Sequence, residues 1–121
     1  MDKFIQSRAN AILDGSDREL LTFAQEHLNY RREKGLDFLG RFNNRYIIGE
    51  AKFLTDFGGH QNAQFEDAIS TIKTKGVKAI MVGILDGVLY IKSRNKMHNF
   101  IKKSKYNIMS ALVLREFLFQ V

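Results

Sequence analysis

Apolar and polar residues alternate with a helical period over the first part of the chain. Apolar side chains at helical spacing predict a helix over residues 2–13. Ser16 and Glu19 then have the three-residue spacing of a capping box, which marks the start of a second helix. That helix carries an apolar stripe and is expected to end before Gly35.

After Gly35 the pattern changes to short runs that are rich in aromatic and β-branched residues. Residues 36–42 and 45–53 form two such runs, which are separated only by Asn43 and Asn44. Asparagine tolerates a positive φ, so this pair suits the two-residue loop of a β-hairpin. Two glycines within residues 57–60 then interrupt the second strand.

The second half of the chain predicts a further helix, a second hairpin and two more helices. Residues 65–72 predict another amphipathic helix. Residues 77–85 and 88–92 flank an Asp-Gly turn signal at Asp86, so they are expected to form a second hairpin. The last expected elements are a basic helix over residues 95–103 and an apolar helix over residues 108–119. This order predicts an α/β fold in which a small mixed sheet, built from two hairpins, is flanked by helices.

Length and composition narrow the class of protein. The chain has 121 residues, enough for one core, so residues 1–121 are expected to form a single domain. The absence of cysteine excludes disulfides, thiolate metal sites and cysteine nucleophiles, and it is compatible with the reducing cytoplasm. No segment has the length and hydrophobicity of a membrane span, so a cytoplasmic protein with no membrane partner is expected.

The charge of the chain favours a polyanionic partner. The formal net charge is +6 and the pI is near 9.7. Residues 1–67 hold nine basic and eleven acidic residues, whereas residues 68–121 hold ten basic and two acidic residues. The densest basic stretch, residues 92–105, contains no carboxylate and is typical of a nucleic-acid-binding surface, with a solvated helix face as the alternative. The side chains expected there to contact phosphates are Arg94, Lys96, Lys102 and Lys103.

Asp37, Glu50 and Lys52 are the residues that best support a chemical function. Glu50 and Lys52 are two positions apart in a predicted strand, so both side chains project from one face of the sheet. If the Asn-Asn pair is the whole loop, Asp37 lies across from Glu50; a three-residue loop would place it across from Ala51. Directly opposed carboxylates destabilise a sheet, but they suit a hard divalent cation that needs several oxygen ligands.

These residue types suit the hydrolysis of a phosphodiester. A divalent metal polarises a phosphoryl oxygen and lowers the pKa of a water molecule that attacks in line. The ammonium group of Lys52 could stabilise the developing negative charge or orient that water. The alternative is an ordinary cross-strand charge cluster on a surface hairpin, but the apolar residues that flank these charges favour a site near the core.

The segment that carries these residues resembles a known nuclease signature. Asp37 follows Leu36, and the second strand reads Ile47-Ile48-Gly49-Glu50-Ala51-Lys52-Phe53. Residues 55–65 continue the likeness. The stretch over residues 35–72 is similar to the PD-(D/E)XK nucleases, and in particular to type II restriction endonucleases.

This resemblance implies a Mg²⁺-dependent endonuclease with a restriction-endonuclease-like core, which acts on double-stranded DNA and usually as a homodimer. It implies that Asp37 and Glu50 are Mg²⁺ ligands and that the backbone carbonyl of Ala51 binds the same ion. Lys52 would be the catalytic lysine. The helix after the second motif strand commonly faces DNA in this family. Its candidate DNA contacts are His60, Gln61, Asn62 and Gln64.

The sequence departs from the family pattern in three ways. Leu36 replaces the proline of the motif, which is a common variation. The family core usually has a strand before the one that carries the first Asp, and no clear strand lies between the Ser16 helix and Gly35, although a short extended piece over residues 28–32 could supply it. The chain is also shorter than most type II restriction enzymes, which suggests a catalytic fragment or a minimal relative. Many members use one more helical carboxylate near the metal, and Glu19 is the candidate for it.

Two alternatives to a restriction endonuclease remain open from the sequence alone. A junction-resolving, structure-selective nuclease would use the same three residues on a small dimer. A DNA-binding or oligomerisation module could keep the fold without activity, although the intact set of Asp37, Glu50 and Lys52 argues against a decayed site.

Overall fold

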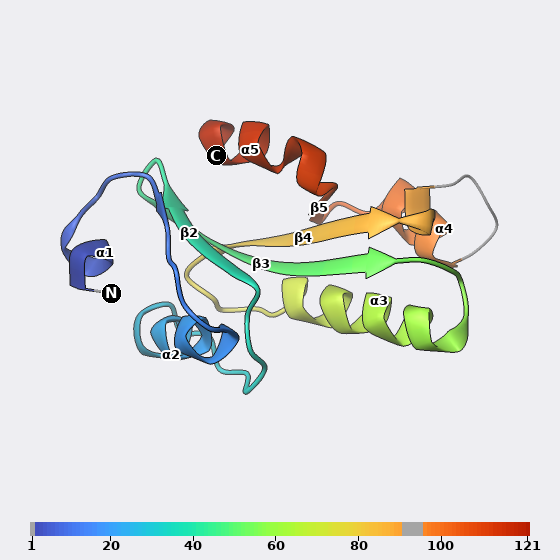
Figure 1. The fold of residues 1–121 in the computed structure, drawn as a ribbon, viewed down its shortest axis with the longest axis horizontal. Helices are drawn as coiled ribbons and strands as arrows, with labels where there is room; N and C mark the ends of the chain where they lie inside the picture. The colour runs from blue at the N-terminus through green and yellow to red at the C-terminus, as the bar shows by residue number, and fades with distance from the viewer. Residues whose placement is uncertain (1, 91–95) are drawn as a thin grey trace.

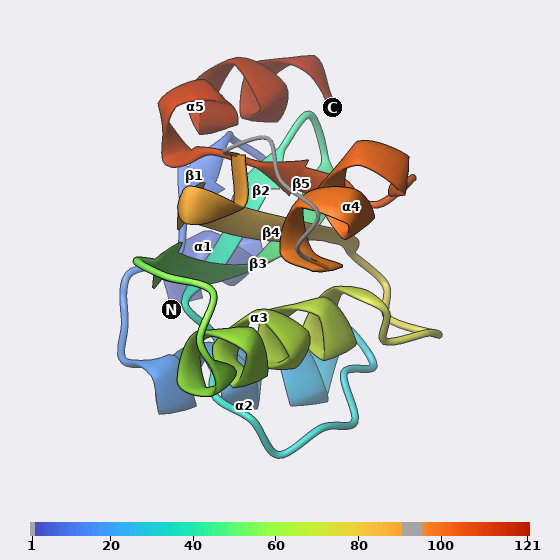
Figure 2. The same ribbon diagram turned by 90° about the vertical axis from the view of Figure 1, so that its right-hand side faces the viewer.

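A five-stranded mixed sheet forms the centre of the fold, and helices cover both of its faces (Figure 1 and Figure 2). The computed structural model describes residues 2–90 and 96–121. The strands follow one another in space in chain order: β1 (Ala11–Ile12), β2 (Phe38–Phe42), β3 (Arg45–Leu54), β4 (Ile80–Gly87) and β5 (Asn107–Met109). The helices are α1 (Asp2–Gln6), α2 (Asp17–His27), α3 (Gly59–Ile72), the 3₁₀ helix η1 (Val88–Tyr90), α4 (Lys96–Lys103) and α5 (Ala111–Gln120).

The mixed character of the sheet comes from two kinds of pairing. β1, β2 and β3 pair antiparallel, whereas β3, β4 and β5 pair parallel. Parallel neighbours need a crossover connection, and α3 supplies it between β3 and β4. The α/β class and the helix-flanked mixed sheet of a restriction-endonuclease-like core are therefore confirmed.

The N-terminal segment differs from its prediction. The expected helix over residues 2–13 is wrong, because α1 ends at Gln6 and the chain then forms β1 beside β2. The buried guanidinium of Arg41 donates hydrogen bonds to the carbonyl oxygens of Phe4 and Ala9. A longer helix would need these carbonyl groups for its own hydrogen bonds, so the contact from β2 favours the extended form.

β1 also corrects the expectation of where the strand before β2 lies. Residues 28–32 have no strand structure, and β1 occupies that position in the sheet instead. The helix between them begins as predicted, since Ser16 and Glu19 form both hydrogen bonds of the capping box. It ends at His27, before Gly35.

The second predicted hairpin is wrong. β4 lies between β3 and β5 and is parallel to both, so neither of its edges is free for a hairpin partner. Gly87 adopts the positive φ that a turn needs, at 107°, but the chain continues into η1. Leu89 of η1 is fully buried in the core between α3 and α4, which draws this segment away from the sheet. Of the expected second strand, residues 91 and 92 lie outside the described ranges.

The C-terminal part keeps the expected basic helix and divides the expected apolar one. α4 matches the basic helix from Lys96 onward. The segment over residues 108–119 begins as part of β5, and α5 starts only after Ser110, whose side chain accepts a hydrogen bond from the backbone N–H of Leu112. The cap therefore separates a short edge strand from the last helix.

The alternation of β3 determines which face the candidate site occupies. Ile48 packs in the cluster around α2, whereas Ile47 packs with Leu118 of α5 on the other face. Because side chains alternate along a strand, Glu50 and Lys52 share the face of Ile48. They therefore lie on the face of the sheet that α2 and α3 cover (Figure 2).

Gly87 is expected to be indispensable for stability. A Cβ atom at this position would lie 1.9 Å from the carbonyl oxygen of Leu54, and the φ of 107° disfavours any L-residue. Gly87→Ala should lower the free energy of unfolding by roughly 3 kcal/mol, measured by urea denaturation.

Gly83→Ala is the matched control in the same strand, since its Cβ would meet side chains no closer than 3.6 Å. It should change the free energy of unfolding by less than about 1 kcal/mol. Equal stability of the two alanine variants would contradict this account of β4.

Candidate active site

The first hairpin brings Asp37 and Glu50 together as the sequence predicts. Phe38 pairs with Gly49 in the antiparallel register of β2 and β3. One position further from the loop, this register places Asp37 across from Glu50. The loop is the two-residue Asn-Asn turn, with φ values of 54° and 63°. The alternative register, which would place Asp37 across from Ala51, does not occur.

A hydrogen bond fixes the carboxylate of Asp37 against the second motif strand. Asp37 directly precedes β2, and its Oδ2 accepts from the backbone N–H of Ala51 at 2.8 Å. Asp37 is exposed, whereas Glu50 is only 2% exposed. The two carboxylates thus stand at the boundary between solvent and the core, with Asp37 on the open side.

Burial strongly affects the carboxyl group of Glu50. Loss of hydration raises its pKa above the ordinary value, and the nearby charge of Asp37 raises it further. Lys34 and Lys52 oppose this rise without cancelling it. In the part of the chain that the structure describes, no hydrogen-bond partner reaches the buried Oε2 of Glu50.

Two lysines and a carboxylate from the helix α3 complete the cluster around Glu50. Lys34 Nζ lies 2.9 Å from Glu50 Oε1 and 2.6 Å from Asp67 Oδ2. Lys52 Nζ lies 3.7 Å from the same Glu50 oxygen and 3.6 Å from the same Asp67 oxygen. Lys34 also donates to Thr71 Oγ1 at 3.1 Å. Each ammonium group therefore bridges β3 and α3.

The pKa values of the two partners follow from these contacts. Burial alone would lower the pKa of Lys34, but its hydrogen bonds to Asp67 and Glu50 outweigh burial and raise it. The hydrogen bond from Lys34 is also the main reason that the pKa of Asp67 lies below its ordinary value. The contacts of this bridge thus favour the charged forms of Lys34 and Asp67, whereas burial favours the protonated form of Glu50.

Lys34 and Asp67 were not identified from the sequence. Lys34 lies in the irregular segment between α2 and β2, where no periodic pattern indicates its direction. Asp67 gave a weak signal, because its neighbours Phe65 and Ala68 belong to the apolar stripe of α3 and place it close to the sheet.

The donor set of this site fits a hard divalent cation. Glu50 and Asp37 offer oxygen ligands, which Mg²⁺ prefers. The Oε2 atom of Glu50 is buried and has no hydrogen-bond partner among the described residues, so it could coordinate a cation. Within the described ranges, no group of three or more histidine, aspartate or glutamate side chains is arranged to hold a metal. A metal here would therefore rest on two carboxylates together with backbone and water oxygens, the coordination that Mg²⁺ commonly has.

Glu19 has the capping role that the sequence predicts, and its role as an extra carboxylate near a metal stays a prediction. Its Oε1 accepts from the backbone N–H of Ser16 at 3.0 Å, and this hydrogen bond is the main cause of its lowered pKa. The helical carboxylate that reaches the lysines of the cluster is Asp67.

The candidate DNA contacts at the start of α3 organise the turn between β3 and that helix. Gln61 Oε1 accepts from the backbone N–H of Thr55, and Asn62 donates to the carbonyl oxygen of Phe57, both at 2.8 Å. His60 and Gln64 lie 2.9 Å apart, on the solvent side of the helix. Gly58 is the N-cap residue, so neither His60 nor Asn62 serves as a cap.

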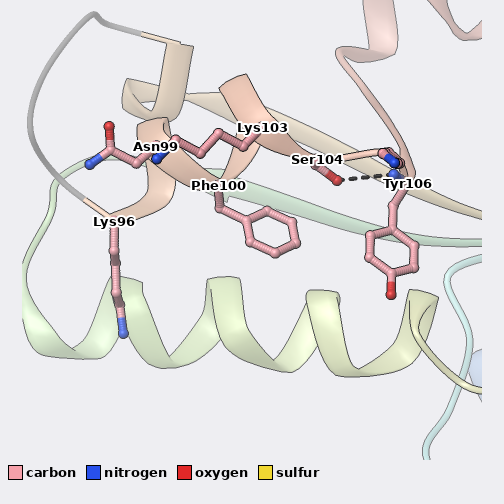
Figure 3. A pocket seen from close by; sticks show the side chains of 7 residues that line it. Lys96, Asn99, Phe100, Lys103, Ser104 and Tyr106 are labelled. Atoms are coloured by element: carbon pink, nitrogen blue, oxygen red, sulfur yellow. Dashed lines mark hydrogen bonds between the residues drawn. The ribbon is translucent and has the colours of Figure 1, made fainter.

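Lys96 and Lys103 of α4 line a pocket that also contains the rings of Phe100 and Tyr106 (Figure 3). Lys96 pairs with Glu66 of α3 at 3.2 Å, whereas the adjacent Asp67 contacts Lys34 and Lys52. The rings of Phe100 and Tyr106 are nearly parallel, with centroids 6.4 Å apart. The pocket is lined by Lys96, Asn99, Phe100, Lys103, Ser104, Lys105 and Tyr106. Lys102 lines a second hollow with Tyr90, His98 and Ile101, and Arg94 lies outside the described residues.

Comparison with known proteins extends the resemblance to the whole chain. A family model described as Tsp45I type II restriction enzyme matches residues 1–121. Searches of the curated proteins and of the solved structures found no match. Over the described ranges, none of the helices has the length and hydrophobicity needed to cross a membrane.

Proposed function

The chain belongs to the Tsp45I type II restriction enzyme family, and on this premise we propose that it is a Mg²⁺-dependent endodeoxyribonuclease that cleaves double-stranded DNA. This membership also confirms the resemblance to type II restriction endonucleases, and it favours a restriction enzyme over the junction-resolving and non-catalytic alternatives. The observation that carries the proposal is the exposed carboxylate of Asp37 beside the buried, partly unpaired carboxylate of Glu50. We further propose that residues 1–121 act as a single catalytic domain in the cytoplasm, where the DNA substrate is found.

Asp37 and Glu50 are the residues proposed to hold Mg²⁺, together with the backbone carbonyl of Ala51. The hydrogen bond from the N–H of Ala51 holds the carboxylate of Asp37 in one orientation, which leaves its other oxygen available. Burial fixes Glu50 and excludes bulk water from it. When bound, Mg²⁺ would polarise a phosphoryl oxygen and make a coordinated water more acidic.

Lys52 is the proposed catalytic lysine. Its side chain shares the strand face of Glu50 and is about a fifth exposed, so the ammonium group can reach a phosphate at the mouth of the site. Its contacts to Glu50 and Asp67 are 3.7 and 3.6 Å, longer than a strong ionic hydrogen bond. These loose contacts leave Lys52 able to stabilise negative charge that develops on the phosphate.

The apolar surface of α5 supports a homodimer. Leu112 is 89% exposed, and Val113 and Phe119 are at least half exposed. Large apolar side chains gathered on one helix favour association with another surface. A dimer would present one site to each DNA strand, as cleavage of a duplex requires.

The roles of Asp37, Glu50 and Lys52 can be tested by plasmid cleavage. Asp37→Asn, Glu50→Gln and Lys52→Met should each reduce the rate of supercoiled plasmid cleavage in Mg²⁺ by at least about 100-fold, because each removes a group from the reacting centre. EDTA should stop cleavage by the native protein.

Asp14→Asn is the control for a carboxylate away from the site, since Asp14 is exposed in the loop before α2, and it should cut at the native rate. Native-like circular dichroism of each variant would exclude unfolding. Full activity in Asp37→Asn or Lys52→Met would refute the catalytic roles assigned to these residues. Discrete fragments from linear DNA, with no preference for four-way junctions, would favour a restriction endonuclease over a junction-resolving nuclease.

The basic surface can be tested by the salt dependence of DNA binding in Ca²⁺. Lys102→Ala/Lys103→Ala should weaken binding to all sequences alike and reduce the slope of log K against log [salt] by roughly 1 to 2, because each phosphate contact contributes about 0.9. Lys75→Ala, in the exposed loop after α3, is the control with a native slope. A slope unchanged by the double substitution would mean that α4 does not contact DNA.

The dimer can be tested by sedimentation. Leu112→Glu should shift the native dimer to monomer, because it introduces a charge into the proposed apolar contact. Gln120→Glu adds the same charge at an exposed position of the same helix and should leave the dimer intact. A native protein that sediments as a monomer at micromolar concentration would contradict the proposal.

A further inference from the structure

The ammonium group of Lys34 connects Glu50 of β3 with Asp67 of α3. It donates to Glu50 at 2.9 Å and to Asp67 at 2.6 Å, and Thr71 provides a third acceptor. The side chain of Glu50 is 3% exposed, whereas that of Asp67 is 44% exposed. Lys34 is therefore the closest positive charge to a nearly buried carboxylate.

A divalent cation and Lys34 require the same carboxylate. A bound cation at Asp37 and Glu50 would stand within a few ångströms of the ammonium group, and like charges at that distance repel strongly where water is scarce. Glu50 Oε1 accepts contacts from both lysines, while Oε2 has no partner among the described residues. Entry of a cation therefore favours departure of Lys34 from Glu50.

Asp67 already pairs with Lys34 and can keep it after that departure. The Lys34–Asp67 contact is shorter than the Lys34–Glu50 contact, and Thr71 remains as an acceptor on the next turn of α3. Both of these acceptors belong to α3, so the ammonium can stay paired without Glu50. The cost of moving Lys34 is thus small, because no charge is left unpaired.

We propose that Lys34 is a built-in counter-ion of Glu50 which a divalent cation displaces, and that Asp67 is the positioning residue which holds Lys34 when the cation binds. This inference rests on the proposed Mg²⁺ site. In the absence of metal, Lys34 keeps the charge of Glu50 compatible with a folded core. In its presence, the same lysine stays beside the site on Asp67 as a positive charge that faces the incoming phosphate.

The first test is calorimetric titration of the full chain with Mg²⁺ and with Ca²⁺, without DNA. Lys34→Met should raise the affinity for both ions by about tenfold, because it removes the competitor for Glu50. Its melting temperature in EDTA should fall below that of the native protein, and added Mg²⁺ should raise it more than in the native protein. Lys75→Met, an exposed lysine after α3, should change neither quantity.

The second test is a double-substitution cycle with Asp67→Asn. Alone, Asp67→Asn should lower metal affinity severalfold, because Lys34 then has no strong acceptor other than Glu50. In the Lys34→Met background the same change should have a clearly smaller effect, since position 34 then has no ammonium group for Asp67 to hold. If Asp67 were instead a direct metal ligand, its loss would be equally damaging in both backgrounds, and that result would overturn the proposal.

The outcomes separate this inference from the proposed function. If Lys34→Met binds metal as well as or more weakly than the native protein, while the native protein cleaves DNA in Mg²⁺, the role of Lys34 is overturned and the proposed function is not. A native protein that binds neither ion would overturn both proposals. If Lys34→Met does not fold even with Mg²⁺, Lys34→Gln provides the same test, because its amide can still donate to Glu50 without a charge.

Discussion

The buried carboxylate of Glu50 is the constraint on which the site depends. An ionised carboxylate removed from water is costly unless cations or hydrogen-bond donors compensate for the lost hydration. Three separate parts of the chain meet at this point: β3 contributes Glu50 and Lys52, the segment before β2 contributes Lys34, and α3 contributes Asp67. The compensation stays incomplete, since burial still raises the pKa of Glu50, and an incompletely compensated carboxylate is well suited to attract a cation.

The parallel pairing of β3 with β4 determines what surrounds that carboxylate. Because parallel strands need a crossover, α3 must run back along the sheet, and this places one side of the helix over Glu50. Adjacent residues of α3 then have different neighbours: Asp67 contacts Lys34 and Lys52, whereas Glu66 pairs with Lys96 of α4. The division between a nearly neutral and a basic half of the sequence thus acquires a spatial meaning: Asp67 contacts the lysines beside Glu50, whereas lysines of the basic half line the pocket at α4 (Figure 3).

The elements that could be predicted from the sequence are those whose causes are local. The capping box at Ser16 and the Asn-Asn turn act over a few residues, and both form as expected. The wrong predictions concern segments that distant groups control. Arg41 of β2 takes carbonyl groups from the expected first helix, and β5 occupies the edge of β4 that a second hairpin would need. Neither competitor is visible in the local pattern of apolar and polar residues.

The sequence predicts the pairing of Asp37 with Glu50 only if the loop has two residues, and it leaves a shift by one position open. The structure has the two-residue Asn-Asn turn, which sets the register of the hairpin, while the alternation of a strand sets the face. The sequence by itself determined that a lysine would stand on that face two residues after Glu50. Only the tertiary structure decided that Lys34 and Asp67 join them. These two residues are 33 positions apart, and they meet because the crossover brings α3 against the segment that leads into β2. Local periodicity describes which face of an element is apolar, but it contains no information about which distant charge that face will meet.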